Sequence, residues 1–179
     1  MSKLYIKKLY NDTTIPTKVN PTDSGFDVYA HNFKKLFYHG GGNGEMELDL
    51  SEDLKHRSWM VNERMEGNTL TLNYLERVLI GVGISATIGV GFELQARPRS
   101  GMAINKGLTV VNTPGTIDEG YRNEIGIIII NLSRKSQTIT LGDKVAQIVP
   151  VAVLLPEIEV VDDLAAASRG MAGFGSSGA

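Results

Sequence analysis

Every second residue from position 78 to position 86 is apolar: Val78, Ile80, Val82, Ile84 and Ala86. The positions between them carry two glycines, a serine and a leucine. Successive side chains of an extended chain point to opposite faces, so this period of two is typical of a β-strand. The segment therefore predicts a strand that turns one apolar row to the core.

The other β-rich runs are short and are separated by Gly, Pro, Asn and Ser. The first is 4–10, and the later ones are 92–96, 108–111, 125–131, 138–141, 144–153 and 158–161. No stretch shows a convincing long pattern of helical period. Many short strands at close spacing predict an all-β sandwich or jelly roll rather than an α/β fold.

The run Ile127–Ile130 is apolar at four consecutive positions. It predicts a strand that is buried on both faces, because a wholly apolar exposed face promotes aggregation. In a chain of this size we expect one face to pack on the core and the other to contact a second subunit.

Composition limits the possible classes of protein. With 179 residues, 42% of them hydrophobic, the chain can bury one core, so a single domain over 1–179 is expected. The formal net charge of -2 does not favour direct binding to nucleic acid or to an anionic membrane. The absence of cysteine excludes disulfides and thiol nucleophiles. No apolar stretch approaches the roughly 20 residues of a membrane span, so we expect a soluble cytoplasmic protein.

The sequence changes character between about 31 and 68. Four of the five residues in 40–44 are glycine, which predicts a tightly turning or flexible connection. Further on, Leu50, Leu54, Val61 and Met65 would share one face of a helix. The segment around 66–68 fits a β-hairpin equally well.

The stretch from Gly115 to Gly126 carries a candidate for chemistry. Asp118 stands beside a glycine-punctuated turn, and Tyr121 follows three residues later. The pattern predicts a carboxylate at the mouth of a β-hairpin, held by a rigid strand, where catalytic groups are often placed. Taken alone, it is more typical of a solvated aspartate in a turn.

The last residues, 169–179, are rich in glycine and have no hydrophobic period. Such a terminus is usually disordered. Its Phe174, Arg169 and hydroxyl groups also suit a segment that closes over a nucleotide, because they can stack on a base and bind phosphate.

Taken together, five stretches resemble the five motifs of the trimeric dUTP pyrophosphatases (dUTPases), in the family's order and from end to end of the chain. They are Ser24–Asp27, Pro98–Ala103, Asn112 with Gly115–Tyr121, Gly142–Gln147 and Arg169–Gly178. The resemblance implies a jelly-roll β fold with a flexible C-terminal arm and a homotrimer with three active sites built between subunits. It also implies Mg²⁺-dependent hydrolysis of dUTP to dUMP and pyrophosphate. That reaction limits uracil incorporation into DNA and supplies dUMP for thymidylate synthesis.

The resemblance assigns roles around the third motif. Asp118 is the expected general base, which activates water for attack on the α-phosphate. Tyr121 is expected beneath the deoxyribose, where it leaves no room for a 2′-hydroxyl. Asn112 is expected to read uracil, with backbone groups completing the base pocket from Gly115, Thr116, Ile117 and Gly126.

The other motifs supply groups for phosphate and metal. Arg99, Ser100 and Gly101 are expected to bind phosphate oxygens, and Gln147 to lie near the α-phosphate, with Arg99 and Gln147 counted as catalytic. Asp27 is expected to hold Mg²⁺ through water, while the phosphates are its direct ligands. In the tail, the residues expected to close over dUTP are Arg169, Phe174, Gly175, Ser176 and Ser177.

Two features depart from the family pattern. Asn123 stands where relatives commonly have glycine, and asparagine tolerates left-handed backbone angles. The segment between the first two motifs is longer by on the order of thirty residues, so we expect an insertion at about 31–68. It is either a decoration of the trimer or a docking surface for a protein partner. Some viral relatives carry such segments, which leaves open a viral or phage-type member in the host-cell cytoplasm.

The sequence leaves two alternatives open. Deoxycytidine triphosphate deaminases share the fold, but they need a catalytic glutamate, and the stretch Ile117–Tyr121 favours the hydrolase. The second alternative is a regulatory protein that acts through 31–68 and uses the nucleotide as a switch.

Overall fold

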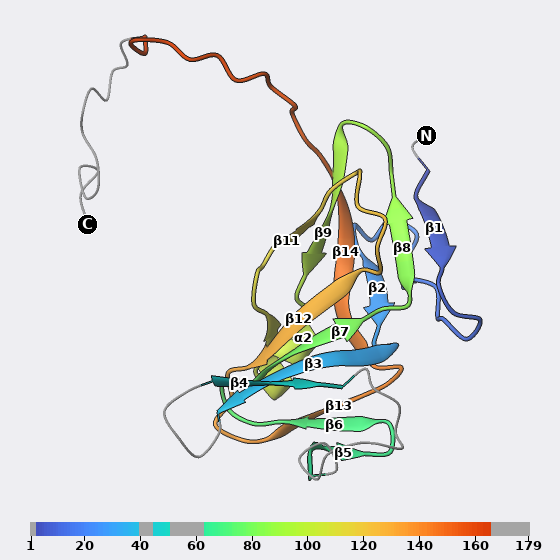
Figure 1. Ribbon diagram of the computed structural model, residues 1–179. Helices are drawn as coiled ribbons and strands as arrows, with labels where there is room; N and C mark the ends of the chain where they lie inside the picture. Colours follow the sequence, from blue (N-terminus) through green and yellow to red (C-terminus); the bar gives the residue numbers. More distant parts are fainter. Residues whose placement is uncertain (1–2, 40–44, 51–62, 166–179) are drawn as a thin grey trace.

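The computed structural model describes residues 3–39, 45–50 and 63–165. Within these ranges the backbone forms fourteen β-strands and one short α-helix, which confirms the all-β class. Figure 1 shows the strands gathered in one body, which the chain leaves as an extended arm after β14 (Lys144–Ala152). No helix in these ranges is long and apolar enough to cross a membrane.

The larger main sheet has five strands in the order β10-β12-β7-β3-β4, each antiparallel to its neighbours. They are β10 (Leu108–Val110), β12 (Gly126–Asn131), β7 (Arg77–Gly81), β3 (Asn32–His39) and β4 (Glu45–Asp49). The register aligns Leu36, Val78 and Ile129 across three strands, and all three side chains are almost fully buried. This row forms the centre of the sheet's core face.

The second main sheet has four strands in the order β11-β9-β14-β2. They are β11 (Gly115–Ile117), β9 (Phe92–Arg97), β14 and β2 (Phe26–Tyr29). Leu94 and Ile148 of this sheet belong to the same buried cluster as Val78 and Ile129. The two main sheets therefore share one hydrophobic core.

Two smaller sheets complete the body. One pairs β1 (Tyr5–Lys8) with β8 (Ile84–Thr87), and the other contains β13 (Gln137–Thr140), β6 (Thr69–Leu72) and β5 (Met65–Glu66).

The alternating row from 78 to 86 is buried as predicted, but it does not lie in one strand. All five apolar side chains are at most 5% exposed. The chain breaks between β7 and β8 at Gly83, which has a φ of 73°. A Cβ at this position would lie 2.7 Å from Thr13 Oγ1, so a glycine is needed both for the backbone angle and for the contact. This turn moves the chain from the five-stranded sheet to β1.

The prediction of a strand at 158–161 is wrong. Within the described ranges these residues have no strand partner, and Ile158 and Val160 are each 94% exposed. They lie in the arm that leaves the body in Figure 1, where none of the described strands supplies backbone hydrogen bonds. In the Ile127–Ile130 run, Ile127 and Ile129 are buried, whereas the other two are only half-buried.

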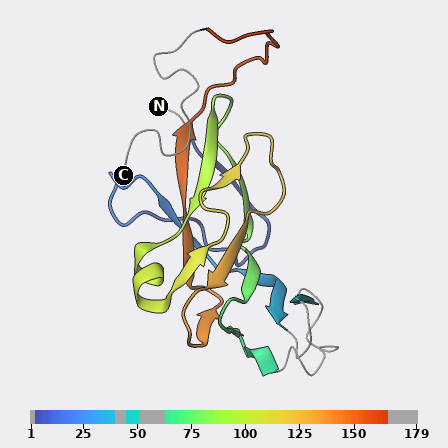
Figure 2. The same cartoon turned by 90° about the vertical axis from the view of Figure 1, so that its left-hand side faces the viewer.

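The sequence pattern does not predict the helix α2 (Ser100–Lys106). None of its residues is buried, so it has no apolar period to detect. Figure 2 shows α2, in yellow-green, at the edge of the body. It ends at Gly107, whose φ is 65° and whose N–H donates to the Ala103 carbonyl. In the sequence, the lysine followed by a glycine, Lys106-Gly107, is typical of the end of a helix.

The described part of 31–68 is not a separate appendage. Strand β3 lies between β7 and β4 in the main sheet, and its Phe33, Leu36 and Tyr38 are core residues. The hairpin predicted around 66–68 is confirmed, because β5 pairs with β6 on either side of Gly67. Most of the alternative helix, and the glycine run 40–44, lie outside the described residues.

We expect Leu36→Ala to lower the free energy of unfolding by about 2–5 kcal/mol, because it leaves a cavity in the centre of the core. Urea unfolding at fixed protein concentration measures the change. Met46→Ala on the neighbouring β4, where the side chain is 47% exposed, is the matched control and should cost less than about 1 kcal/mol. Equal effects of the two changes would mean that β3 is not part of the core.

Candidate functional site

Asp27 on β2 is held between two cations that come from distant parts of the chain. Its Oδ1 lies 2.9 Å from Arg99 Nε, and its Oδ2 lies 2.9 Å from Lys144 Nζ. Arg99 precedes α2 and Lys144 begins β14. Arg99 Nη1 also donates to the Lys144 carbonyl at 3.4 Å. Two guanidinium nitrogens of Arg99 are therefore fixed, which sets the orientation of its planar group.

A cavity of about 390 Å³ lies beside this cluster. Gln147 lines it, and its Nε2 donates to the Pro98 carbonyl at 3.2 Å. A Cβ at Gly25 would come within 2.3 Å of Gln147 Oε1, so a larger residue there would have to displace this amide. The predicted site residues that line the cavity are Asp27, Arg99, Ser100, Gly101 and Gln147. Three stretches far apart in the sequence thus meet at one polar cavity.

Asp118 lies elsewhere. Strand β11 pairs with β9 so that Ile117 lies opposite Leu94, which places Asp118 beside Glu93. Arg99 follows the other end of β9, six residues after Glu93. At about 3.3 Å per residue the two ends are roughly 20 Å apart. One chain therefore does not bring Asp118 and Arg99 together, and Asp118 instead lines a separate cavity of about 560 Å³ with Glu93.

The prediction that Asp118 stands in a β-hairpin is wrong. Strand β11 pairs with β9, whereas β12 pairs with β7 and β10. Residues 118–125 therefore cross from one main sheet to the other, and the side chain of Asp118 is exposed in this crossing. A turn with the Tyr121 N–H donating to the Asp118 carbonyl, at 3.1 Å, brings the two residues together as the sequence suggests.

The predicted base-pocket residues lie on and around β11. Gly115 is buried, and a Cβ there would lie 3.1 Å from Asn112 Nδ2. Thr116 is exposed and Ile117 is nearly buried. Tyr121 is 38% exposed, and its hydroxyl donates to the Glu124 carbonyl at 2.9 Å. Asn112 and Tyr121 thus flank the strand that leads to Asp118.

Gly126 has a different reason to be glycine. It begins β12 opposite Gly81, and a Cβ there would meet Leu79 Cδ1 at 2.8 Å. Its small size is therefore explained by packing between β12 and β7.

Comparison with known proteins shows the family of the chain. A sequence profile of the dUTPase family matches residues 68–178, well over half of the chain. The chain belongs to the dUTPase family.

Named relatives extend the match. The deoxyuridine 5′-triphosphate nucleotidohydrolase of Bdellovibrio bacteriovorus is 49% identical over 150 residues, which is 83% of this chain and 96% of the relative. That of a Hydrogenobaculum species is 36% identical over 176 residues, 98% of both proteins, so its length accommodates the segment 31–68. The dUTPase of Staphylococcus bacteriophage 80alpha, solved with dUPNHPP, shares the fold with a TM-score of 0.72, at 22% identity over the whole of both chains.

The tail residues predicted to close over the nucleotide, Arg169, Phe174, Gly175, Ser176 and Ser177, lie outside the described residues. The dUTPase resemblance remains the reason for their assignment.

The residues around Asp27 fit a magnesium ion only as an outer contact. Each carboxylate oxygen already faces a cation, which leaves its remaining lone pair for a water molecule. Among residues 3–39, 45–50 and 63–165, no three His, Cys, Asp or Glu side chains are grouped to hold a metal.

Two polar residues of the site were missed in the sequence. Lys144 lies in a motif stretch but had no assigned role, and it is a cation partner of Asp27. Glu124 is bonded to Lys34, to Asn32 and to the Gly83 N–H. In the sequence, Glu124 stands directly before a run of apolar strand residues. A carboxylate buried at such a position needs polar partners, so this pattern indicates a paired acid.

Two opposing influences set the pKa of Glu124. Burial raises it, but the hydrogen bond and charge of Lys34 and the hydrogen bonds from Gly83 and Asn32 lower it more, so the pKa lies below its ordinary value.

We expect this carboxylate to stabilise the fold above about pH 4.3, the ordinary glutamate value, and to lose its contribution as pH falls through its lowered pKa. Glu124→Gln removes the titration, so between pH 7 and pH 3 its melting temperature should fall less steeply than that of the wild type. Glu157→Gln, at an exposed position of the arm, is the control and should follow the wild type. Parallel curves for all three proteins would contradict the assignment.

Proposed function

We propose that this chain hydrolyses dUTP to dUMP and pyrophosphate, as its family membership indicates, and that it does so with the two groups of residues described above. The observation that carries the proposal is the meeting of Asp27, Arg99 and Gln147 at one polar cavity, since the three come from three of the stretches that resemble dUTPase motifs.

The cavity supplies the phosphate end of the site. Arg99, with its orientation set by Asp27, would bind phosphate oxygens together with Ser100 and Gly101. Gln147 would contact the substrate near the α-phosphate. Asp27 would meet Mg²⁺ through water, because its oxygens already face cations. When bound, the ion neutralises phosphate charge that develops during the displacement.

Residues 118–125, which we call the crossing segment, and Asn112 would supply the groups that contact the base, the sugar and the attacking water. Asp118 is exposed and free to take a proton from water. Tyr121 would lie beneath the deoxyribose and exclude a 2′-hydroxyl, and Asn112 would read uracil beside the backbone of β11. Because a ribonucleotide carries this 2′-hydroxyl, its exclusion would make the site specific for a deoxynucleotide.

The separation of roughly 20 Å along β9 supports a site in which the two groups come from different copies of the chain. We therefore propose a homotrimer in which Asp118 of one subunit faces Arg99 of another. Two exposed apolar surfaces support association. Ile128 and Ile130 are only half-buried on β12, and the arm exposes Leu154, Ile158 and Val160.

The activity is tested by incubating the protein with Mg²⁺ and either dUTP or dCTP and identifying the products. We expect dUMP and pyrophosphate from dUTP. Release of ammonia from dCTP would instead identify a deaminase and overturn the proposal.

The shared site is tested by complementation. We expect Asp118→Asn to bind nucleotide but to lose about 10²–10⁴-fold in kcat, because it lacks the general base. Arg99→Ala should also be nearly inactive. In randomly mixed trimers from co-expression, about one quarter of the sites would combine an intact Asp118 with an intact Arg99, so activity should return to that extent. No recovery, with mixed trimers shown by mass spectrometry, would mean that each site lies within one chain.

A further inference from the structure

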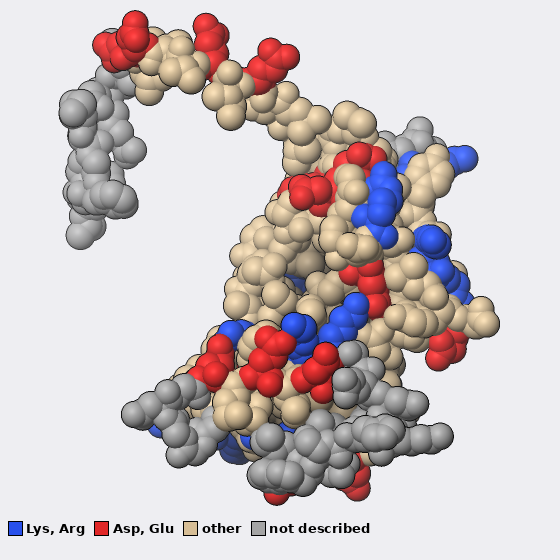
Figure 3. All heavy atoms as spheres, viewed as in Figure 1, with Lys and Arg blue, Asp and Glu red and all other residues tan. Residues whose placement is uncertain are grey.

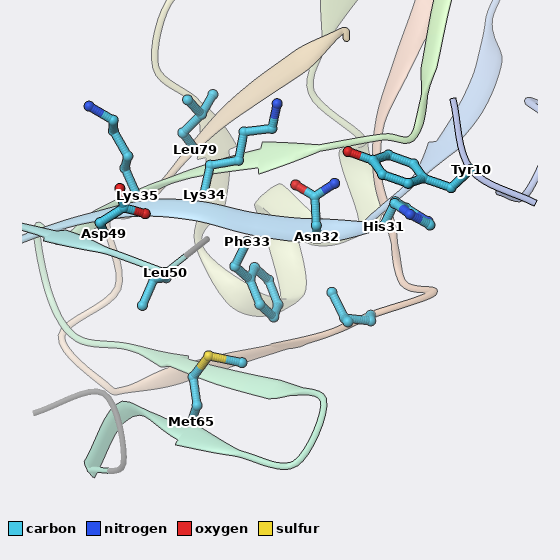
Figure 4. A pocket seen from close by; sticks show the side chains of 11 residues that line it. Tyr10, His31, Asn32, Phe33, Lys34, Lys35, Asp49, Leu50, Met65 and Leu79 are labelled. Atoms are coloured by element: carbon cyan, nitrogen blue, oxygen red, sulfur yellow. The ribbon is translucent and has the colours of Figure 1, made fainter. Parts of the chain in front are cut away.

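The carboxylate of Glu124, in the crossing segment, has one ion-pair partner and two hydrogen-bond donors. Its side chain is 7% exposed. Oε2 lies 2.7 Å from Lys34 Nζ, and Oε1 accepts hydrogen bonds from the Gly83 N–H at 2.7 Å and from Asn32 Nδ2 at 3.0 Å. Figure 4 shows Asn32 and Lys34 on one side of β3 and Phe33 on the other. Glu124 thus attaches the crossing segment to β3 and to the turn after β7.

The ion pair of Glu124 differs from its neighbours on the same face. Lys and Arg side chains alternate with carboxylates over β3, β4 and β7 in Figure 3. They include the pairs of Lys35 with Glu47 and of Arg77 with Glu45, whose members are 33–45% exposed. Exposed pairs of this kind contribute little to stability. In the pair of Glu124 with Lys34 the carboxylate side chain is only 7% exposed, and it accepts two further hydrogen bonds.

The backbone is built to admit this carboxylate. A Cβ at Gly81 would lie 2.4 Å from Glu124 Oε1 and 2.5 Å from Asn32 Oδ1. Gly83, which donates its N–H to the same oxygen, has the positive φ of 73°. Two glycines therefore make the space and the donor that the carboxylate uses.

The main chain of Glu124 is directed toward Tyr121. The Ile125 N–H donates to the Ile84 carbonyl at 2.9 Å. Because the peptide unit is planar and trans, the Glu124 carbonyl points the opposite way. It accepts the hydrogen bond of the Tyr121 hydroxyl there at 2.9 Å. Glu124 thus links the hydroxyl of Tyr121 to β3 through its side chain and, through the next peptide unit, to β8.

We propose that Glu124 is a positioning residue that sets the dUTP-over-UTP selectivity of this enzyme by holding Tyr121. The inference rests on the proposed function, in which Tyr121 excludes the ribose hydroxyl. Glu124 touches no reacting atom. It determines how far the ring can move away, and the ring admits a 2′-hydroxyl only if it moves. Lys34 and Asn32 belong to the segment 31–68, so this segment contributes to selectivity through β3.

The test compares kcat/KM for dUTP with kcat/KM for UTP in purified full-length variants. We expect Glu124→Ala to lower the dUTP:UTP ratio at least about tenfold, since small displacements of a positioning group have large kinetic effects. Lys34→Met should lower it in the same direction by less. Tyr121→Phe, which loses the bond to the Glu124 carbonyl, should lower it as well, and adding Glu124→Ala to Tyr121→Phe should have little further effect because the two act together.

Glu76 provides the matched control. It is also buried, at 2% exposure, and its carboxylate is 2.9 Å from Arg64 Nη2 and accepts the Asn73 N–H at 2.8 Å. Glu76→Ala should lower the melting temperature and leave the ratio unchanged. A ratio that also stays unchanged in Glu124→Ala would reduce Glu124 to a structural ion pair and overturn the inference.

Two further outcomes are decisive. If Glu124→Ala does not fold, Lys34→Met and Tyr121→Phe decide, because neither removes the buried carboxylate, and wild-type ratios in both would overturn the inference. If the wild type turns over no dUTP, the proposed function itself fails. Hydrolysis of dUTP by the wild type together with an unchanged ratio in the variants refutes only the role of Glu124.

Discussion

Strand β9 connects the two groups of candidate site residues in the described part of the chain. Its pairing with β14 sets Gln147 opposite Arg97, two residues before Arg99. Its pairing with β11 sets Ile117, the residue before Asp118, opposite Leu94. The register of both pairs is fixed by buried side chains, because a slip of one residue would turn the apolar rows to solvent. The proposed phosphate-binding end and the proposed water-activating end are thus held at a constant separation, and our proposal of a site between copies of the chain rests on this separation.

Paired carboxylates hold the two ends in place. Asp27 fixes Arg99 and Lys144 at one end, and Glu124 fixes the crossing segment at the other. Each is a largely buried acid whose charge is offset by a cation from a distant strand. Removal of one partner would leave a buried charge unpaired, which is costly, so these clusters specify geometry more than they add stability. They link strands that the hydrophobic core alone would not orient to the accuracy that chemistry needs.

Much of the fold follows from the sequence, and the exceptions have physical causes. The row from Val78 to Ala86 is correctly predicted as buried, but periodicity does not reveal the break at Gly83, where the chain changes sheets while its apolar rhythm continues. Helix α2 has no fully buried residue and packs only Met102 against the core, so its sequence has no apolar period. The arm at 158–161 has the composition of a strand but no neighbour to pair with.

The sequence indicates which residues form the candidate site better than it indicates how they are arranged in space. Asp27, Arg99 and Gln147 are found from short stretches that resemble dUTPase motifs, and the fold brings these three together. The sheet change between β11 and β12 was not predictable, because Ile117 and Ile125 look like the two arms of a hairpin when only local sequence is considered. Glu124 has no signal beyond being an acid beside a buried strand. Its partners are brought to it by tertiary structure.

We propose that one catalytic site uses Asp118 from one copy of the chain and Arg99 and Gln147 from another. The most direct measurement is a crystal structure of the full-length protein with Mg²⁺ and a non-hydrolysable dUTP analogue. We expect the phosphates to contact Arg99 and Gln147 of one subunit and the carboxylate beside the α-phosphate to be Asp118 of its neighbour. An analogue held by Asp118 and Arg99 of the same chain would rule out the shared site.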